Sequence, residues 1–380
     1  MTRQSKSPRP EGARRGGPQV HFFLLGVSAT PIGGYKVVYE YANTLVSHGF
    51  HVTLWHSRAF YADLPGARRI SARIKAAARA LQARIRFGRR PISWFEIDPR
   101  VRVRVSAGYP NPRLRPGDAV VASAVETTPR VAKAAARAGA RSVALIQHYE
   151  TWAASESFIQ RSWGMVDERI VIAPWLGDLC KLNGLGSHLI PNAIDPLAFP
   201  RGKFLREREP SVLSLISPHV YKRADVVIAA LEGIHRAAPE ITLRAFGQET
   251  RPEGLPEYVS YYHAPSPALL ATLYGEAVVY LCGSDAEGWH LPPAEATMAG
   301  AAVVSTDIGG VRVSMEDDAL YARPADSVAL AQRVLDTMAD LESAQERADR
   351  ARARIGARTY ETNARDLARA LRIGDGKNEI

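Results

Sequence analysis

Short apolar runs alternate with amphipathic stretches from residue 20 onward, and this alternation restricts the fold more than any other feature of the chain. The first run, residues 20–27, reads as a buried strand. The next stretch, residues 35–49, carries apolar side chains at helical spacing and ends on Gly49, a residue suited to a helix C-terminus. Strands that alternate with helices predict βαβ units and a parallel sheet. The expected class is therefore α/β.

The strand-like runs form two series, and the 380 residues, 46% of them hydrophobic, can supply two cores. The first series predicts a Rossmann-like, doubly wound domain over residues 19–190, and the second predicts another over 211–355. Between them, residues 191–210 carry prolines and a charge run typical of a linker. A last amphipathic piece within 356–380 is expected to pack back on the first domain.

The N-terminal segment and the cysteines indicate the cellular compartment of the protein. Residues 1–18 are basic and rich in Pro and Gly, and we interpret them as a disordered tail. The apolar run that follows is too short to span a membrane and lacks a cleavage pattern. Cys180 and Cys282 lie far apart, without the spacing of a disulfide framework or a zinc site. These features favour a cytoplasmic protein.

The net charge of +10 is concentrated in two segments, the tail and residues 68–90. The second holds nine basic residues and no acidic one, and its apolar residues form a helical stripe: Ile70, Ile74, Ala77, Leu81 and Ile85. This pattern indicates a basic amphipathic helix that can lie on an anionic membrane. An ordinary core stripe with a solvated arginine face is the alternative. Nucleic-acid binding is disfavoured because stacking aromatics and zinc fingers are lacking.

Glu287 and Glu295 lie on either side of two prolines, directly after the apolar run 277–282. Proline suits the first turn of a helix, so the expected order is strand, loop and helix start. Glu287 would then lie on the loop and Glu295 in the first helical turn, beside free backbone N–H groups and the positive end of the helix dipole. Such a site suits an anion flanked by hydroxyl groups.

Gly33 and Gly34 lie between the first strand and the first helix, where α/β folds place phosphate-binding loops. They would allow a ligand to approach the backbone closely, although a plain turn is the alternative. The spacing GxGxxG is absent, so an NAD or FAD oxidoreductase is disfavoured. Lys222 and Arg223 follow a predicted strand of the second domain; taken alone, such a pair is usually a solvated surface pair.

Four segments in order resemble glycosyltransferase family 4. EGWHLPPAEATMAGAAVVSTDIGG is similar to the donor-site segment of that family, in which two glutamates are separated by seven residues. IGGYKVVYEYANTLVSHGFHVTLW looks like its opening glycine loop and helix, LIPNAIDPLAF like its interdomain segment, and YKRAD like its lysine motif. Together the resemblance covers almost all of residues 20–372.

The resemblance implies a GT-B architecture, in which two Rossmann-like domains face each other across a cleft. It further implies sugar transfer from a nucleotide-sugar donor to a hydroxyl acceptor with retention of anomeric configuration. Glu295 would hold the ribose hydroxyls, Glu287 the donor sugar, and Lys222 the diphosphate. His148, at a strand end of the first domain, would face the donor sugar and acceptor. The donor loop between the glutamates comprises Gly288, Trp289, His290 and Leu291.

The segment ALIQHYETW, followed by RIVIAPWL, resembles a bacterial subgroup that makes cell-surface polysaccharides and includes rhamnosyltransferases. No two aspartates are separated by a single residue, so the Asp-x-Asp site of many metal-dependent glycosyltransferases is missing. We therefore expect no metal and no cofactor. A departing diphosphate would be stabilised by Lys222, Arg223 and a helix N-terminus.

Two departures from the family pattern leave other functions open. Ile216 and Ser217 stand where the family usually has Gly-Arg, so one phosphate-binding cation is missing, which Arg223 would have to replace. His290 stands where a second glycine is usual. A weakly active or non-catalytic sugar-nucleotide-binding protein is therefore one alternative. A GT-B sugar-nucleotide epimerase and, less favoured, a nucleic-acid-binding protein are the others.

Overall fold

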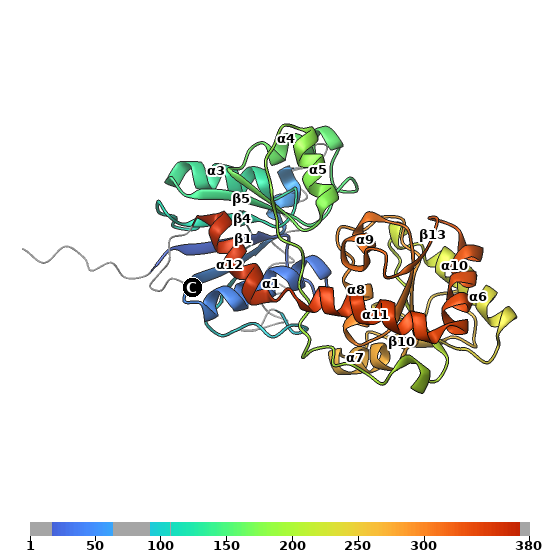
Figure 1. The fold of residues 1–380 in the computed structure, drawn as a ribbon. Coiled ribbons are helices and arrows are strands. Elements are labelled where there is room, and N and C mark those ends of the chain that lie inside the picture. Colours follow the sequence, from blue (N-terminus) through green and yellow to red (C-terminus); the bar gives the residue numbers. More distant parts are fainter. Residues whose placement is uncertain (1–16, 64–91, 107, 373–380) are drawn as a thin grey trace, which may run out of the picture.

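The computed structural model describes residues 17–63, 92–106 and 108–372, which form two α/β domains lying side by side (Figure 1). Most of the basic N-terminal tail, the predicted amphipathic helix at 68–90 and residues 373–380 lie outside the described residues. The chain passes between the domains through the linker and returns to the first domain at its C-terminal end (Figure 1).

The first domain is built on a seven-stranded parallel sheet in the order β3-β2-β1-β4-β5-β6-β7. Its strands are β1 (Gln19–Leu24), β2 (His51–Ser57), β3 (Arg102–Ser106), β4 (Ala119–Ala122), β5 (Arg141–Ile146), β6 (Glu168–Val171) and β7 (His188–Leu189). Its helices are α1 (Gly33–Ser47), the 3-10 turn η1 (Arg58–Asp63), α3 (Thr128–Ala138), α4 (Glu156–Trp163) and α5 (Pro174–Leu182).

The second domain repeats this plan with a six-stranded parallel sheet in the order β10-β9-β8-β11-β12-β13. Its strands are β8 (Ser211–Leu215), β9 (Thr242–Gly247), β10 (Ser260–His263), β11 (Val279–Cys282), β12 (Ala302–Thr306) and β13 (Leu320–Ala322). Its helices are η2 (Leu205–Glu207), η3 (Val220–Lys222), α6 (Ala224–Ala237), α7 (Pro267–Glu276), α8 (Leu291–Met298), α9 (Gly309–Met315), α10 (Ser327–Ala339) and α11 (Leu341–Gly356).

Burial explains why the strands could be predicted. Helices cover both faces of a parallel sheet, so its strands read as continuous apolar runs. β4 and β11 are buried along their whole length. The predicted α/β class with two doubly wound domains is confirmed, and the predicted strands at 20–27 and 277–282 correspond to β1 and β11. β7 and β13 were not predicted, because both residues of β7 are exposed and two of the three residues of β13 are only partly buried.

The last described helix, α12 (Tyr360–Leu371), belongs spatially to the first domain and packs against α1 and β6. The hydroxyl of Thr359 caps its N-terminus by accepting from the N–H of Thr362. Its buried face includes Asn363, whose amide donates to the carbonyl of Pro191 at 2.7 Å, and the fully buried Leu367. The chain therefore crosses the domain junction twice, and the two crossings are hydrogen-bonded to each other.

The strand orders place one topological switch point in each sheet, between β1 and β4 and between β8 and β11. In open α/β sheets, ligands bind beyond the carboxyl ends of the strands at this point, because the two flanking loops diverge there. The loops after β8 and β11 therefore mark where a ligand site of the second domain is expected.

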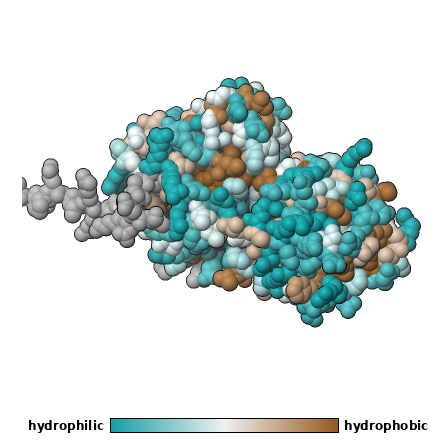
Figure 2. All heavy atoms as spheres, viewed as in Figure 1, coloured by the Kyte–Doolittle hydropathy of each residue, from teal (hydrophilic) through white to brown (hydrophobic). Residues whose placement is uncertain are grey.

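The surface is mixed rather than uniformly polar. In the view of Figure 2 the second domain is mainly hydrophilic, and the largest hydrophobic area lies over the first domain. None of the helices in the described part of the chain combines the length and the apolar character that a membrane span requires.

Leu367→Ala tests the docking of α12. The substitution leaves a cavity under a fully buried side chain, so it should destabilise the protein by about 2–5 kcal/mol. The measurement is urea denaturation followed by circular dichroism. Arg365→Ala, on the exposed side of the same helix, is the matched control and should stay within about 0.5 kcal/mol of wild type. Equal midpoints for both variants would contradict the assignment of α12 to the core.

Candidate active site

The loops after β8 and β11 meet at the switch point of the second sheet. The first loop carries η3, which ends on Lys222, and the second runs from β11 to α8 and carries Glu287 and His290. The two loops are joined by a backbone hydrogen bond, in which the N–H of Asp285 donates to the carbonyl of Tyr221 at 2.8 Å. The predicted lysine and glutamate motifs, far apart in the sequence, are therefore neighbours in space.

An ion pair lies at the centre of this junction. The Lys222 ammonium is 2.6 Å from a carboxylate oxygen of Glu287, and both side chains are largely buried. His290 approaches both partners, with its Nε2 3.2 Å from Lys222 Nζ and 3.5 Å from the same Glu287 oxygen. Behind the ring, Nδ1 lies 3.4 Å from the Cys282 thiol. Lys222, Glu287 and His290 thus form one polar cluster.

The environment sets the protonation of the cluster. Burial acts to raise the pKa of Glu287, but His290 and Lys222 outweigh it and hold the pKa below its usual value. Burial lowers the pKa of His290 from 6.5 to about 3. At neutral pH the carboxylate is therefore charged and the imidazole is neutral.

Gly288 brings this loop against the first domain. A Cβ at residue 288 would overlap the carbonyl of Gln147, so only glycine fits there. The indole of Trp175 donates to the Gly288 carbonyl at 3.2 Å, and Gln147 donates to the carbonyl of Gly34 at 3.2 Å. Gln147 and Trp175 were not singled out in the sequence, because nothing local distinguishes them from other polar and aromatic residues. Gln147 thus contacts both of the predicted glycines, Gly34 and Gly288.

Gly33 and Leu291 also lie at this junction, because a Cβ at residue 33 would be 3.3 Å from the Leu291 side chain. Trp289 is 7% exposed, and its indole N–H has no hydrogen-bond partner among the described residues. The structure thus places every predicted member of the donor loop at or directly beside the contact between the two domains.

Glu295 lies one turn further into α8 than predicted. The helix begins at Leu291, one residue before the two prolines, so residue 295 falls in the second turn. Its carboxylate accepts from Lys36 of α1 at 2.7 Å and from the Tyr274 hydroxyl at 3.3 Å. Lys36 was missed in the sequence. A lysine in the first turn of a helix opposes the helix dipole, and that was the available signal for an acidic partner nearby.

Arg223 adopts a left-handed backbone conformation with φ +50°, which glycine usually occupies. Its guanidinium is held at 2.8 Å by the carboxylates of Asp225 and Asp285. Ile216, where the family pattern has glycine, is 3% exposed and packs in the core of the second domain. The positive charge at this loop is therefore carried by Lys222 and Arg223, and both are already paired.

His148 lies two residues beyond β5 and faces the same junction. Its ring contacts Trp152, Trp175 and Tyr221, with centroid distances of 4.5, 6.0 and 6.2 Å. Burial lowers the pKa of His148. Both ring nitrogens are buried and lack a side-chain hydrogen-bond partner among the described residues.

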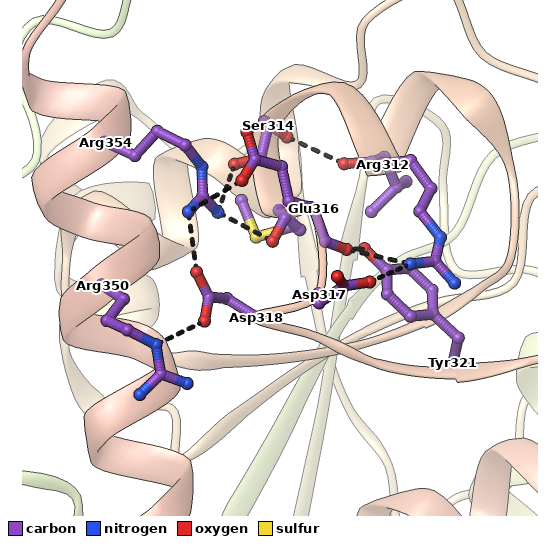
Figure 3. Close-up of polar contacts among 10 residues, drawn as sticks. Arg312, Ser314, Glu316, Asp317, Asp318, Tyr321, Arg350 and Arg354 are labelled. Atoms are coloured by element: carbon purple, nitrogen blue, oxygen red, sulfur yellow. Dashed lines mark hydrogen bonds and ion pairs between the residues drawn. The ribbon is translucent and has the colours of Figure 1, made fainter.

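A charged network fixes α9, whose first residues contact the Glu287 loop. A Cβ at Gly310 would overlap Glu287, and the Gly310 carbonyl accepts from the N–H of His290. At the other end of α9, Arg354 of α11 donates to the carbonyls of Ser314 and Met315, the last residues of α9. Figure 3 shows Arg354 and Arg350 reaching from α11 to Asp318 in the same network. This network holds α9 in place from the far side of the site.

No group of three or more His, Cys, Asp or Glu side chains that could hold a metal ion occurs within 17–63, 92–106 and 108–372. The polar groups that converge on the junction are instead cations, carboxylates, a neutral imidazole and backbone N–H groups. Such a set can bind hydroxyl groups through its carboxylates and an anion through its cations.

Residues 210–340, the greater part of the second domain, match the family model described as "Glycosyl transferases group 1". This is the domain that holds Lys222, Glu287 and Glu295. No curated protein sequence matches the chain.

Several solved structures share the fold over nearly the whole length. Sucrose-phosphate synthase from Thermosynechococcus elongatus superposes with a TM-score of 0.71 and 17% identity, covering 93% of this chain and 98% of that one. Anabaena HepE in complex with UDP-glucose gives 0.67 and 15%, with 93% and 99% covered. Trehalose-phosphate synthase from Burkholderia xenovorans gives 0.65 and 15%, with 93% and 100% covered.

These structural matches confirm the predicted GT-B fold. The second domain is in addition a group 1 glycosyltransferase domain by its family match. The chain therefore has the GT-B fold, and its second domain matches a glycosyltransferase family model.

Gly288→Ala tests the close contact between the domains. The added methyl group must push the loop away from Gln147, at a cost of about 1–3 kcal/mol. We expect a lower thermal midpoint and a larger radius of gyration in small-angle scattering. Gly186→Ala, at a residue with open space around its Cβ position, should leave both values unchanged. If Gly288→Ala behaves like Gly186→Ala, the contact is wrong.

His290 predicts an acid sensitivity of the fold. Its pKa is about 3 in the folded protein against 6.5 when unfolded, so the unfolded state binds the extra proton first as the pH falls. The contribution of His290 to the free energy of unfolding should therefore drop by about 1.4 kcal/mol for each pH unit below 6.5 until the folded pKa is reached. The measurement is the free energy of unfolding from urea titrations between pH 5 and 8. His290→Asn should make this free energy depend less steeply on pH. His51→Asn, at an exposed residue, should leave this dependence as in wild type, and equal slopes in all three proteins would refute the prediction.

Proposed function

We propose that the protein transfers a sugar from a nucleotide-sugar donor to a hydroxyl acceptor, with retention of anomeric configuration and without a metal ion. The observation that carries the proposal is the buried Lys222–Glu287 pair at the switch point of the domain that matches the glycosyltransferase model. The comparisons are in keeping with it, because HepE and TarM are described in complexes with UDP or UDP-glucose.

Lys222 would neutralise the donor diphosphate. An ammonium has three N–H donors, so Lys222 can keep its bond to Glu287 and still reach a phosphate oxygen. Glu287 would then contact the donor sugar next to the departing group, and the neutral His290 would separate the two charges from the Cys282 thiol. Arg223 could contribute only by sharing its guanidinium with Asp225 and Asp285.

Glu295 would hold the ribose hydroxyls. Both of its oxygens already accept from protein groups, but a carboxylate has about four acceptor sites and can accept from hydroxyls as well. Burial acts to lower the pKa of Lys36, but the charge of Glu295 outweighs this effect and raises the pKa, so Lys36 keeps its positive charge. Lys36 would thereby orient Glu295 and connect α1 of the first domain to the ribose site.

The transfer itself would be a front-side displacement. The bond from the anomeric carbon to the diphosphate oxygen breaks as the acceptor oxygen attaches on the same face, and the acceptor proton passes to the departing diphosphate. No protein nucleophile is assigned. His148, whose buried ring nitrogens lack a side-chain hydrogen-bond partner among the described residues, would contact the donor sugar and the acceptor.

The cellular setting is part of the same proposal. We place the protein in the cytoplasm, with residues 68–90 as a contact to the anionic inner face of a membrane and a bacterial cell-surface polysaccharide as the product. This setting rests on the basic amphipathic pattern and on the resemblance of ALIQHYETW to polysaccharide-forming enzymes.

The first experiment is a ligand-observed NMR screen of UDP-, GDP- and dTDP-sugars, followed by a release assay for the free nucleoside diphosphate. With the donor thus found, Lys222→Ala should lower the turnover about 100-fold or more, because a cation at the developing charge is removed. Lys133→Ala, at an exposed lysine of α3, is the matched control and should keep wild-type turnover.

The outcomes separate the candidate functions. Binding of a donor without release of diphosphate, even in the presence of acceptors, favours the non-catalytic nucleotide-sugar-binding protein that Ser217 suggests. A new sugar nucleotide formed from the donor alone favours an epimerase. Unchanged turnover in Lys222→Ala removes the diphosphate role of this lysine.

A further inference from the structure

Three aromatic rings from both domains are stacked in series beside the candidate active site. The ring of Trp152, from the loop after β5, is nearly parallel to that of Tyr221 from η3, with 17° between the planes and 5.7 Å between the centroids. Tyr221 stacks in turn on His219 at 16° and 5.6 Å. The ring of His148 meets Trp152 edge-on. We use the name aromatic platform for Trp152, Tyr221 and His148; His219 is not part of it.

The loop after β5, which carries His148 and Trp152, is anchored on the first domain. Tyr149 packs on Trp163 and its hydroxyl accepts from Gln160, while the Glu150 carboxylate accepts from the N–H of Val125 at 2.7 Å. The loop also turns back on itself, since the N–H of Ala153 donates to the Glu150 carbonyl. Residues 149 and 150 thus anchor the loop, and residues 148 and 152 are left to face the second domain.

Trp152 is unusually exposed for an indole. It is 58% exposed, whereas Trp163 and Trp289 are 3% and 7% exposed. Large aromatic side chains normally bury their faces, and an exposed aromatic face beside a reaction site is typical of a ligand contact. One face of Trp152 is taken by Tyr221, so the open surface of the ring is directed away from that stack.

Polar atoms without partners lie around the platform. Both nitrogens of His148 and one carboxylate oxygen of Asp285 are buried and have no hydrogen-bond partner among the described residues. Asp285 is joined to Tyr221 through the backbone. A pyranose ring has an apolar face of C–H groups and a rim of hydroxyls. It therefore matches a flat aromatic face that lies beside polar atoms without hydrogen-bond partners. An alkyl chain would leave these polar atoms unpaired, which is unfavourable.

We propose that the aromatic platform is the acceptor subsite and that it binds a pyranose ring stacked on Trp152. The acceptor hydroxyl is therefore carried by a sugar and not by a simple aliphatic alcohol. This inference rests on the proposed transferase function and names the acceptor class of that site. Trp152 and Tyr221 come from different domains, so the complete subsite exists only when the two domains are together.

The binding test uses 19F NMR of protein labelled with 5-fluorotryptophan. The chain has six tryptophans, and Trp152→Phe assigns the resonance of Trp152 by its loss. Methyl glycosides of hexoses and 6-deoxyhexoses are titrated as probes, with 1-octanol as the aliphatic comparison. We expect the glycosides to shift the Trp152 resonance in a saturable way while octanol does not. The buried Trp163 supplies an internal reference.

The activity test separates acceptor binding from donor binding. Trp152→Ala should raise the KM for a glycoside acceptor about tenfold, because a central tryptophan contact is removed, and leave the donor Kd unchanged. Trp152→Phe should recover part of the effect. Tyr258→Ala is the matched control, since Tyr258 is also exposed and stacked on a histidine, His235, but lies away from the site.

The outcomes distinguish this inference from the proposed function. If a nucleotide sugar binds but no glycoside shifts the Trp152 resonance, or if Trp152→Ala leaves the acceptor KM unchanged, the pyranose subsite is wrong and the transferase proposal stands. A larger shift with octanol than with the glycosides also overturns the inference. If the glycosides shift the resonance while no nucleotide sugar binds, the carbohydrate site stands and the transferase proposal fails.

Discussion

The close contact between Gly288 and the carbonyl of Gln147 is the constraint on which the site depends. It allows the loop after β11 to reach the first domain without a side chain between them, and Trp175 completes the contact by donating to the Gly288 carbonyl. Glu287 and His290 lie on either side of this residue, so their positions follow from it. The domain junction and the polar cluster are thus one structural unit, so a displacement of one also displaces the other.

The charges at the junction are balanced before any ligand binds. Lys222 is paired with Glu287, Lys36 with Glu295, and Arg223 with Asp285. Pairing offsets the cost of burying these groups and fixes their side chains in one geometry. An anion that approaches such a site meets cations that are already oriented. The side chains of the site therefore need to rearrange little when the anion binds. The proposed diphosphate and ribose contacts share this arrangement, since each uses a residue that is already part of an ion pair.

Much of the architecture could be predicted because it depends on local patterns. Parallel strands buried on both faces appear as apolar runs, and β1, β4 and β11 were found in this way. β7 and β13 were not, because strands of two and three residues that are mostly not fully buried leave no such pattern. Among the site residues, Lys222 and Glu287 were found through their motifs. Lys36, Gln147, Trp175 and Tyr221 were missed, because their importance arises from partners more than thirty residues away in the chain.

The sequence by itself determined the two-domain α/β fold and the loops that carry the polar residues. These features depend on side-chain periodicity and on the backbone limits of proline and glycine, which act within a few residues. Only the tertiary structure decided which charges pair, that Glu295 faces Lys36, and that Trp152 and Tyr221 stack across the junction. The Lys36–Glu295 and Trp152–Tyr221 contacts join segments of different domains, and their geometry is set by how the two sheets are placed relative to each other.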